Sequence, residues 1–318
     1  MLRKFAYNKI FRTTGMLVLL MLLLLFPASK EYSLEDDRVV KTSNTETKKE
    51  VFLLDKDGYV ARCKASINYN DNLDYAKKLM EFLIIGGKYE QRIPNGFKAI
   101  LPSDTQINDI KIKEDKIELD LSSDALEIEK NNAKKMIDLI TYNLTTIDGV
   151  KFVYLKIDGK LLDKVPNTNI ILNQPLSRKN GVNINYEAFN YKNASLTTIY
   201  FINKNNSGYY YVPVSKVTND NRDKIKIIVD ELTSSHIYET NLMSFLNYNT
   251  KLINYELKED VLTLDFNSYL FDDASSKSIL EEVVYSISLS VRDNYDVKEV
   301  IFTVDGNEIT KSVLKNIE

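Results

Sequence analysis

The residues able to do chemistry are few in this chain, and their spacing matches no catalytic or metal-binding pattern. The 318 residues include one Cys and one His, too few for an intramolecular disulfide or a Cys/His zinc site. A nucleophilic triad would have to use His236, which has no neighbour of a known catalytic pattern. We predict a surface loop for His236 and a buried, unreactive side chain for Cys63.

The carboxylates give no better case for catalysis. Asp120 and Asp265 occupy matching places near the ends of two alternating segments, and a catalytic acid there would need a second carboxylate at a fixed distance. We predict that both face solvent or cap the following helix. Asp272-Asp273 lacks the spacing of a calcium loop and suits the N-terminus of a helix. The sequence therefore predicts no enzyme, no cofactor, no metal and no small-molecule substrate.

Composition limits the partners further. Lys and Arg number 42 and Asp and Glu 45, for a net charge of −3, which argues against nucleic-acid binding. The chain has no Trp, which argues against sugar stacking. An apolar fraction of 44% over this length suits two domains.

The N-terminus resembles a secretory signal or a membrane anchor. Eleven apolar residues, 16–26, follow a basic segment, and the uncharged stretch before Lys30 would span about 26 Å as a helix. A cut after Ala28 or Ser29 would put Phe26 or Pro27 at position −3, where a small residue is needed. We therefore expect an uncleaved anchor through residues 13–29, a cell-membrane location and an extracytoplasmic remainder; a cleaved signal peptide (1–29) and secretion are the alternative. Residues 30–50 are predicted to be a flexible tether.

The rest of the chain repeats itself. Lys113–Leu121 recurs as Lys258–Phe266 at an offset of 145 residues, and Val150–Gly159 recurs as Val297–Gly306 at an offset of 147. Repeats of this length indicate two tandem domains. We place unit one at 51–163, a linker at 164–195 and unit two at 196–318.

Each unit alternates strand and helix patterns. In unit one, a hairpin turns at Asp57-Gly58, a helix starts near Asn72, a second hairpin spans 107–121, another helix follows Ser122-Ser123-Asp124, and a last strand, 152–157, leads to Asp158-Gly159. The predicted fold is α/β (α+β), with two tandem homologous domains, each a small mixed sheet covered by two helices.

Two segments resemble the GerM (spore formation and germination) domain family. They are the Leu101-Pro102-Ser103-Asp104-Thr105 segment with the following 117–122 strand, and the closing strand with its Asp-Gly turn. Unit two is similar, with Asn247 in place of the proline. The residues that carry the family motif are Leu101, Pro102, Thr105, Asp120, Asp158, Gly159, Thr250, Asp265, Asp305 and Gly306.

The resemblance implies a non-catalytic envelope protein of endospore formers without a cofactor. It implies a role in assembling the complex that bridges mother cell and forespore, with other envelope or sporulation proteins, including ring-forming ones, as partners. A cell-wall-binding or peptidoglycan-remodelling protein is the alternative. Independently, Tyr209, Tyr210 and Tyr211 lie in an alternating strand, and we expect a contact surface there, at a sheet edge.

Overall fold

The structure is a computed structural model that describes residues 30–33, 48–190, 192–234, 240–273, 275 and 277–314. The apolar segment 13–29 and His236 lie outside these residues, so the predictions made for them stay predictions. Within the described part of the chain, no helix is both long enough and apolar enough to cross a bilayer.

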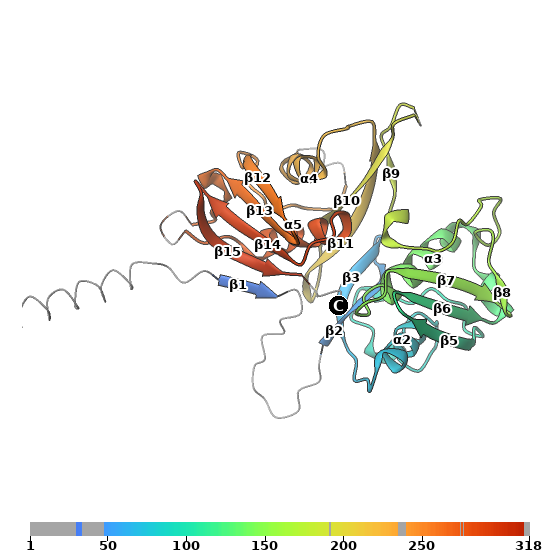
Figure 1. Ribbon diagram of the computed structural model, residues 1–318. Helices are drawn as coiled ribbons and strands as arrows, with labels where there is room; N and C mark the ends of the chain where they lie inside the picture. Colours follow the sequence, from blue (N-terminus) through green and yellow to red (C-terminus); the bar gives the residue numbers. More distant parts are fainter. Residues whose placement is uncertain are drawn as a thin grey trace, which may run out of the picture.

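Unit one has a four-stranded sheet of order β5-β6-β7-β8 and two main helices (Figure 1). Strands β6 and β7 are parallel and the outer pairs are antiparallel. The bounds are α2 Asn72–Glu81, η1 Glu90–Arg92, β5 Ile107–Lys113, β6 Lys116–Leu121, η2 Ser123–Glu127, α3 Lys130–Leu144, β7 Phe152–Ile157 and β8 Lys160–Leu161.

Unit two repeats this order of elements in a sheet of order β1-β15-β14-β13-β12. Its β13–β14 pair is parallel. A register shift between Leu252 and Asn254 in β12 matches one between Ile107 and Asp109 in β5, so the two copies share even this irregularity. The bounds are α4 Lys224–Thr233, β12 Leu252–Lys258, β13 Val261–Phe266, η5 Ser268–Leu270, α5 Glu281–Asn294, β14 Glu299–Val304 and β15 Asn307–Val313.

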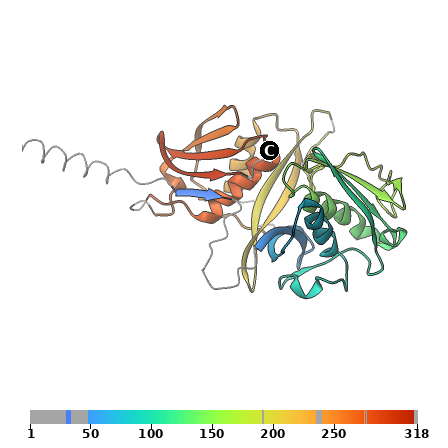
Figure 2. The same ribbon diagram turned by 60° about the horizontal axis from the view of Figure 1, so that its bottom comes forward.

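The first hairpins of the two units join in one further sheet, of order β10-β11-β3-β2-β4, with β9 beside β11. Tyr211 of β11 pairs with Arg62 of β3, and Figure 2 shows the long β10–β11 hairpin between the two units. The α/β composition and the tandem arrangement are confirmed, but the prediction of one small sheet per unit is wrong. The bounds are β2 Lys48–Asp55, β3 Val60–Ser66, β4 Phe97–Lys98, β9 Asn185–Tyr186, β10 Ser195–Asn205 and β11 Gly208–Thr218.

The shared sheet explains why α3 and α5 are buried almost all round. Helix α3 contacts β2, β3 and β7, and α5 contacts β10 and β15, so each helix lies between the shared sheet and the sheet of its own unit. All nine residues from Met136 to Leu144 are buried, as expected of a helix covered on every side. Asn143 within this helix donates to Phe52 O at 2.8 Å and accepts from Phe52 N at 2.9 Å, which satisfies a buried polar side chain.

The segment predicted as a tether differs from a tether at both ends. Its first residues form strand β1 (Lys30–Ser33), which pairs in parallel with β15 of unit two. Its last three residues belong to β2. Between them, residues 34–47 lie outside the described part of the chain.

Candidate functional site

The two motif aspartates hold turns. Asp120, near the end of β6, accepts the Gly159 N–H with both carboxylate oxygens, at 2.9 and 3.0 Å. Asp265, near the end of β13, accepts the Gly306 N–H at 2.9 Å and the Thr303 hydroxyl at 2.6 Å. Both side chains are half-buried and fix the turn after the neighbouring parallel strand, a role that the prediction of a solvent-facing or helix-capping carboxylate did not include.

The turns themselves need this support because of their backbone. Asp158 has a φ of 47° and Gly159 of 77°, and Asp305 and Gly306 have 50° and 77°. Two successive positive φ angles define the tight hairpin turn in which Asp-Gly is favoured. The four residues are thus turn residues, in agreement with their sequence pattern.

The Leu-Pro-x-x-Thr part of the motif also has a structural role. Leu101 is fully buried and donates its N–H to Leu83 O at 2.7 Å. The Pro102 carbonyl accepts the Thr105 N–H at 3.0 Å, which closes a turn before β5. In unit two, the Thr250 hydroxyl donates to Tyr269 O at 3.0 Å, so this turn is tied to the segment after β13.

The motif residues do not converge on one site. Asp120 and Asp265 belong to the sheets of different units, and each bonds the Asp-Gly turn of its own unit. No cluster of three or more metal-ligating side chains occurs among the described residues. Cys63 is buried, donates to Val51 O at 3.4 Å, and has a pKa that burial raises to about 12, as expected of an inert thiol.

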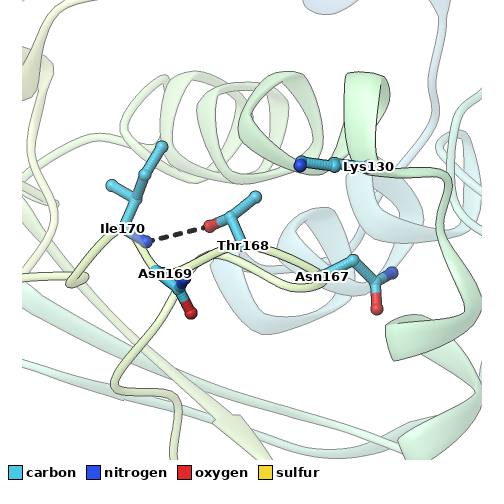
Figure 3. A pocket seen from close by; sticks show the side chains of 5 residues that line it. All are labelled: Lys130, Asn167, Thr168, Asn169 and Ile170. Carbon is cyan, nitrogen blue, oxygen red and sulfur yellow. Dashed lines mark hydrogen bonds between the residues drawn. The ribbon is translucent and has the colours of Figure 1, made fainter.

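One shallow pocket lies beside the start of α3 (Figure 3). Its walls come from Lys130 and the linker residues 167–170, and the Ile170 N–H donates to the Thr168 hydroxyl at 3.1 Å. Asn167 uses its amide group to bond Leu126 O and Ile128 O. A single lysine beside backbone-bonded polar groups does not form a set of convergent catalytic groups.

The three tyrosines are divided among different surroundings. Tyr209 is 54% exposed and stacks edge-on against Phe245. The buried Tyr210 donates its hydroxyl to Asp55 of unit one at 2.9 Å, and Tyr211 is half-buried. Strand β11 has neighbours on both sides, so the predicted sheet edge is wrong, and the tyrosines face the other unit as well as solvent.

Charged side chains concentrate where the two units meet. We call the following set the inter-unit cluster: Glu50, Arg62, Arg178, Tyr200, Arg292 and Asp293. Glu50 of β2 pairs with Arg62 Nε at 3.1 Å, and Arg292 of α5 donates to both of its carboxylate oxygens, at 3.2 and 3.3 Å. Such a two-pronged contact fixes direction as well as distance, so the contact orients unit two on unit one.

Arg178 from the linker completes this cluster. Its guanidinium donates to Asp293 Oδ1 at 2.8 Å and to the Thr145 hydroxyl at 2.9 Å. It lies 4.8 Å from the centre of the Tyr142 ring, a cation–π distance. Tyr200 donates to the second oxygen of Asp293 at 2.8 Å. A linker side chain thereby joins the last helix of each unit.

The cluster is arranged to keep Glu50 ionised. Burial opposes the charged form of Glu50, but Arg292, Arg62 and Arg178 together outweigh burial and hold the pKa of Glu50 well below its usual range. Burial and the nearby Asp293 raise the pKa of Tyr200, so its hydroxyl stays a neutral donor. Charges paired in this way stabilise one relative position of the units.

The linker contributes further contacts that a flexible spacer would lack. Asn183 donates to Val60 O at 2.8 Å and to Pro213 O at 2.7 Å, and accepts from Val60 N at 3.0 Å. Its side chain thus bridges β3 and β11 where these strands are not paired directly. Gln174 bonds Leu155 N and O at 2.7 and 2.9 Å. The linker is a structural part of the interface.

The sequence pattern missed the residues of this interface. Arg178 stands in a segment rich in Asn and Pro, and nothing near it marks a buried position. The fully buried Asp55 is easier to recognise as an interface residue, because in the sequence it directly follows the apolar run Val51–Leu54. An acid at the end of a fully apolar strand indicates a buried polar partner.

The comparisons with known proteins agree with this architecture. A family model described as "Sporulation and spore germination" matches residues 50–163 and 198–310. The chain is 32% identical over 264 residues to the spore germination protein GerM of Bacillus subtilis, which covers 81% of this chain and 71% of that protein. The solved tandem GerMN domains of that sporulation protein superpose with a TM-score of 0.75 at 30% identity, covering 84% of this chain and 94% of that one. The chain therefore belongs to the GerM family of sporulation and spore germination proteins.

Proposed function

We propose that this protein is a non-enzymatic, membrane-anchored envelope protein that acts in endospore formation. Its role is to assemble or stabilise the protein complex that bridges mother cell and forespore. Family membership supports the link to sporulation. The basic and apolar residues 3–26 support the anchor.

The assembly role is supported by the ion pairs and hydrogen bonds that the carboxylates at the boundary between the two units make. Glu50 and Asp55 of unit one bond side chains of unit two, and Asp293 of unit two bonds Arg178 of the linker. Carboxylates with this many fixed partners serve to hold two domains in one orientation. A body of fixed shape built from two similar units suits a protein that positions other proteins.

Deletion of the gene tests the proposal. We expect the deletion strain to grow normally and to fail in spore formation after engulfment begins, and the wild-type gene to restore spores. A complementing Asp120→Asn variant should also restore them, because an asparagine oxygen can still accept the Gly159 N–H. Normal sporulation of the deletion strain would refute the role.

A separate assay tests the non-enzymatic part. The full chain, purified in detergent, is incubated with cell walls, and release of peptidoglycan fragments is measured. We expect none. Fragment release that is lost in Asp120→Asn or Asp265→Asn, with circular dichroism unchanged, would establish the peptidoglycan-remodelling alternative.

A further inference from the structure

Strand β1 has a defined direction at the edge of unit two. It pairs in parallel with β15, with Lys30 opposite Thr310 and Ser33 opposite Val313. Figures 1 and 2 both show β1 beside β15, with its arrow pointing toward the shared sheet and its start facing away from unit one. Strand β1 therefore begins toward the end of the sheet where β15 begins.

That end of the sheet, which we call the exit end, is defined by the strand pairing. Asn307, the first residue of β15, pairs with Val304, the last of β14, and Phe266 at the end of β13 pairs with Leu252 at the start of β12. The exit end thus contains the Asp305-Gly306 turn together with the segments before β12 and after β13. These segments are tied by the Thr250–Tyr269 bond at 3.0 Å.

The exit end exposes large apolar and aromatic side chains. Tyr248 is 79% exposed, Ile253 61% and Tyr269 53%. The internal repeat supplies a comparison, because the same places in unit one, at the offset of 145 residues, hold Ser103, Asn108 and Asp124. The two copies share strand order and register there, so folding does not require the apolar side chains. At these three places the large apolar side chains occur in unit two alone, whereas unit one has the exposed Leu161 where unit two has Glu308.

These two independent observations point to the same surface. In the sequence, the apolar run 16–26 ends four residues before Lys30, the first residue of β1. Tyrosine and aliphatic side chains favour the boundary between lipid and water. The exposed charges there are of both signs, with Asp305 and Glu308 beside Lys251, so net attraction to anionic lipids is not the basis of the proposed contact. The contact depends on Tyr248, Ile253 and Tyr269.

We propose that unit two, although second in the chain, is the membrane-proximal unit, and that its exit end rests on the lipid surface through Tyr248, Ile253 and Tyr269. Unit one is then held away from the bilayer by the shared sheet. The inference rests on the membrane anchor in the proposed function. In this arrangement, unit one is the unit that faces partners away from the membrane.

Two matched single-cysteine labels test the arrangement in the full chain, reconstituted in vesicles of a neutral phospholipid that carries a quencher. The positions are Asn307→Cys and Lys160→Cys, which follow the equivalent Asp-Gly turns of the two units and are both exposed. Buried Cys63 does not compete for label. We expect strong quenching at 307 and little at 160. Equal quenching, or stronger quenching at 160, in chain that remains bound to the vesicles would overturn the inference and leave the anchor intact.

Further variants test separately whether the three side chains touch lipid and whether β1 is paired with β15. Replacing Tyr248, Ile253 and Tyr269 by the unit-one residues Ser, Asn and Asp should reduce the quenching at 307 without releasing the chain. Unchanged quenching would show that these side chains do not touch lipid and would overturn that part of the inference.

Disulfide cross-linking tests the pairing of β1 with β15. Glu31 and Lys311 are partners in the strand register, so cysteines at these two positions lie at disulfide distance and should cross-link. The pair Glu31→Cys with Leu161→Cys should not cross-link. The reverse pattern would overturn the docking of β1. Release of the unaltered chain from the vesicles would refute the anchor and this inference together.

Discussion

Replacing Arg178 by Met should destabilise the protein far more than removing an arginine from its surface. The Arg178 side chain is 14% exposed and its partner Asp293 is fully buried. Removing one member of a buried ion pair costs about 3–5 kcal/mol, because a charge is left without a partner. Tyr200 and Arg292 still contact Asp293, at 2.8 and 3.4 Å, so we expect the lower end, about 3 kcal/mol.

The chain supplies its own control. Arg222 also contacts two carboxylates, Asp220 at 2.7 Å and Asp230 at 2.6 Å, but its side chain is 51% exposed. Arg222→Met should therefore cost about 1 kcal/mol or less. Added salt should weaken the effect at Arg222, because exposed charges are screened, and leave the effect at Arg178 nearly unchanged.

Urea unfolding measures both variants. The chain has no Trp, so tyrosine fluorescence and far-UV circular dichroism are the probes. If the cost at Arg178 arises from the unpaired Asp293, the double variant Arg178→Met with Asp293→Asn should recover much of the loss. The reasoning is refuted if Arg178→Met loses no more than Arg222→Met, or if the double variant loses the sum of the two single losses.

Three further predictions concern stability. Desolvation of the buried Asp138 outweighs its contact with Lys134 and raises its pKa to about 6. Because the native state then binds more protons than the unfolded chain, the free energy of unfolding should fall as pH rises from about 4 to 6. Asp138→Asn should abolish this fall when urea unfolding is measured against pH. Gly181→Ala should lower stability by about 1–3 kcal/mol, because φ is +76° and the new Cβ would lie 2.8 Å from Leu196 Cδ1; an unchanged urea midpoint would contradict this. Leu119→Ala and Leu264→Ala, at equivalent buried places, should each cost roughly 2–5 kcal/mol, and a small loss at either one would show that the two cores are not equivalent.

The internal repeat predicted more of the fold than any single segment did. Lys113–Leu121 and Lys258–Phe266 both form the turn and second strand of an antiparallel pair followed by a parallel partner. These are local patterns of alternation and turn residues, which the sequence displays directly. The helices were equally visible, because each carries apolar residues at the helical spacing.

The shared sheet was not predictable in the same way. Tyr211 and Arg62 are 149 positions apart, and pairing over such a separation leaves no periodic signal in one sequence. The run Val51–Leu54 is buried throughout. A continuous apolar strand of this kind indicates that other elements pack on both of its faces, but the sequence does not show which elements these are. The same limit hid the inter-unit cluster, since Glu50 and Arg292 look like ordinary surface charges until the fold brings them together.

The structural linker has a consequence for how chains of this kind can change in length. A segment between duplicated domains is usually the easiest place to insert or delete residues, because loop closure costs little. Here Gln174, Arg178 and Asn183 each bond a different strand or helix, so one added residue between them would displace at least one of these contacts. Insertions, and fluorescent reporters for imaging in living cells, belong instead in an exposed turn such as 206–207. The duplication joined the two copies through a segment whose length is now fixed.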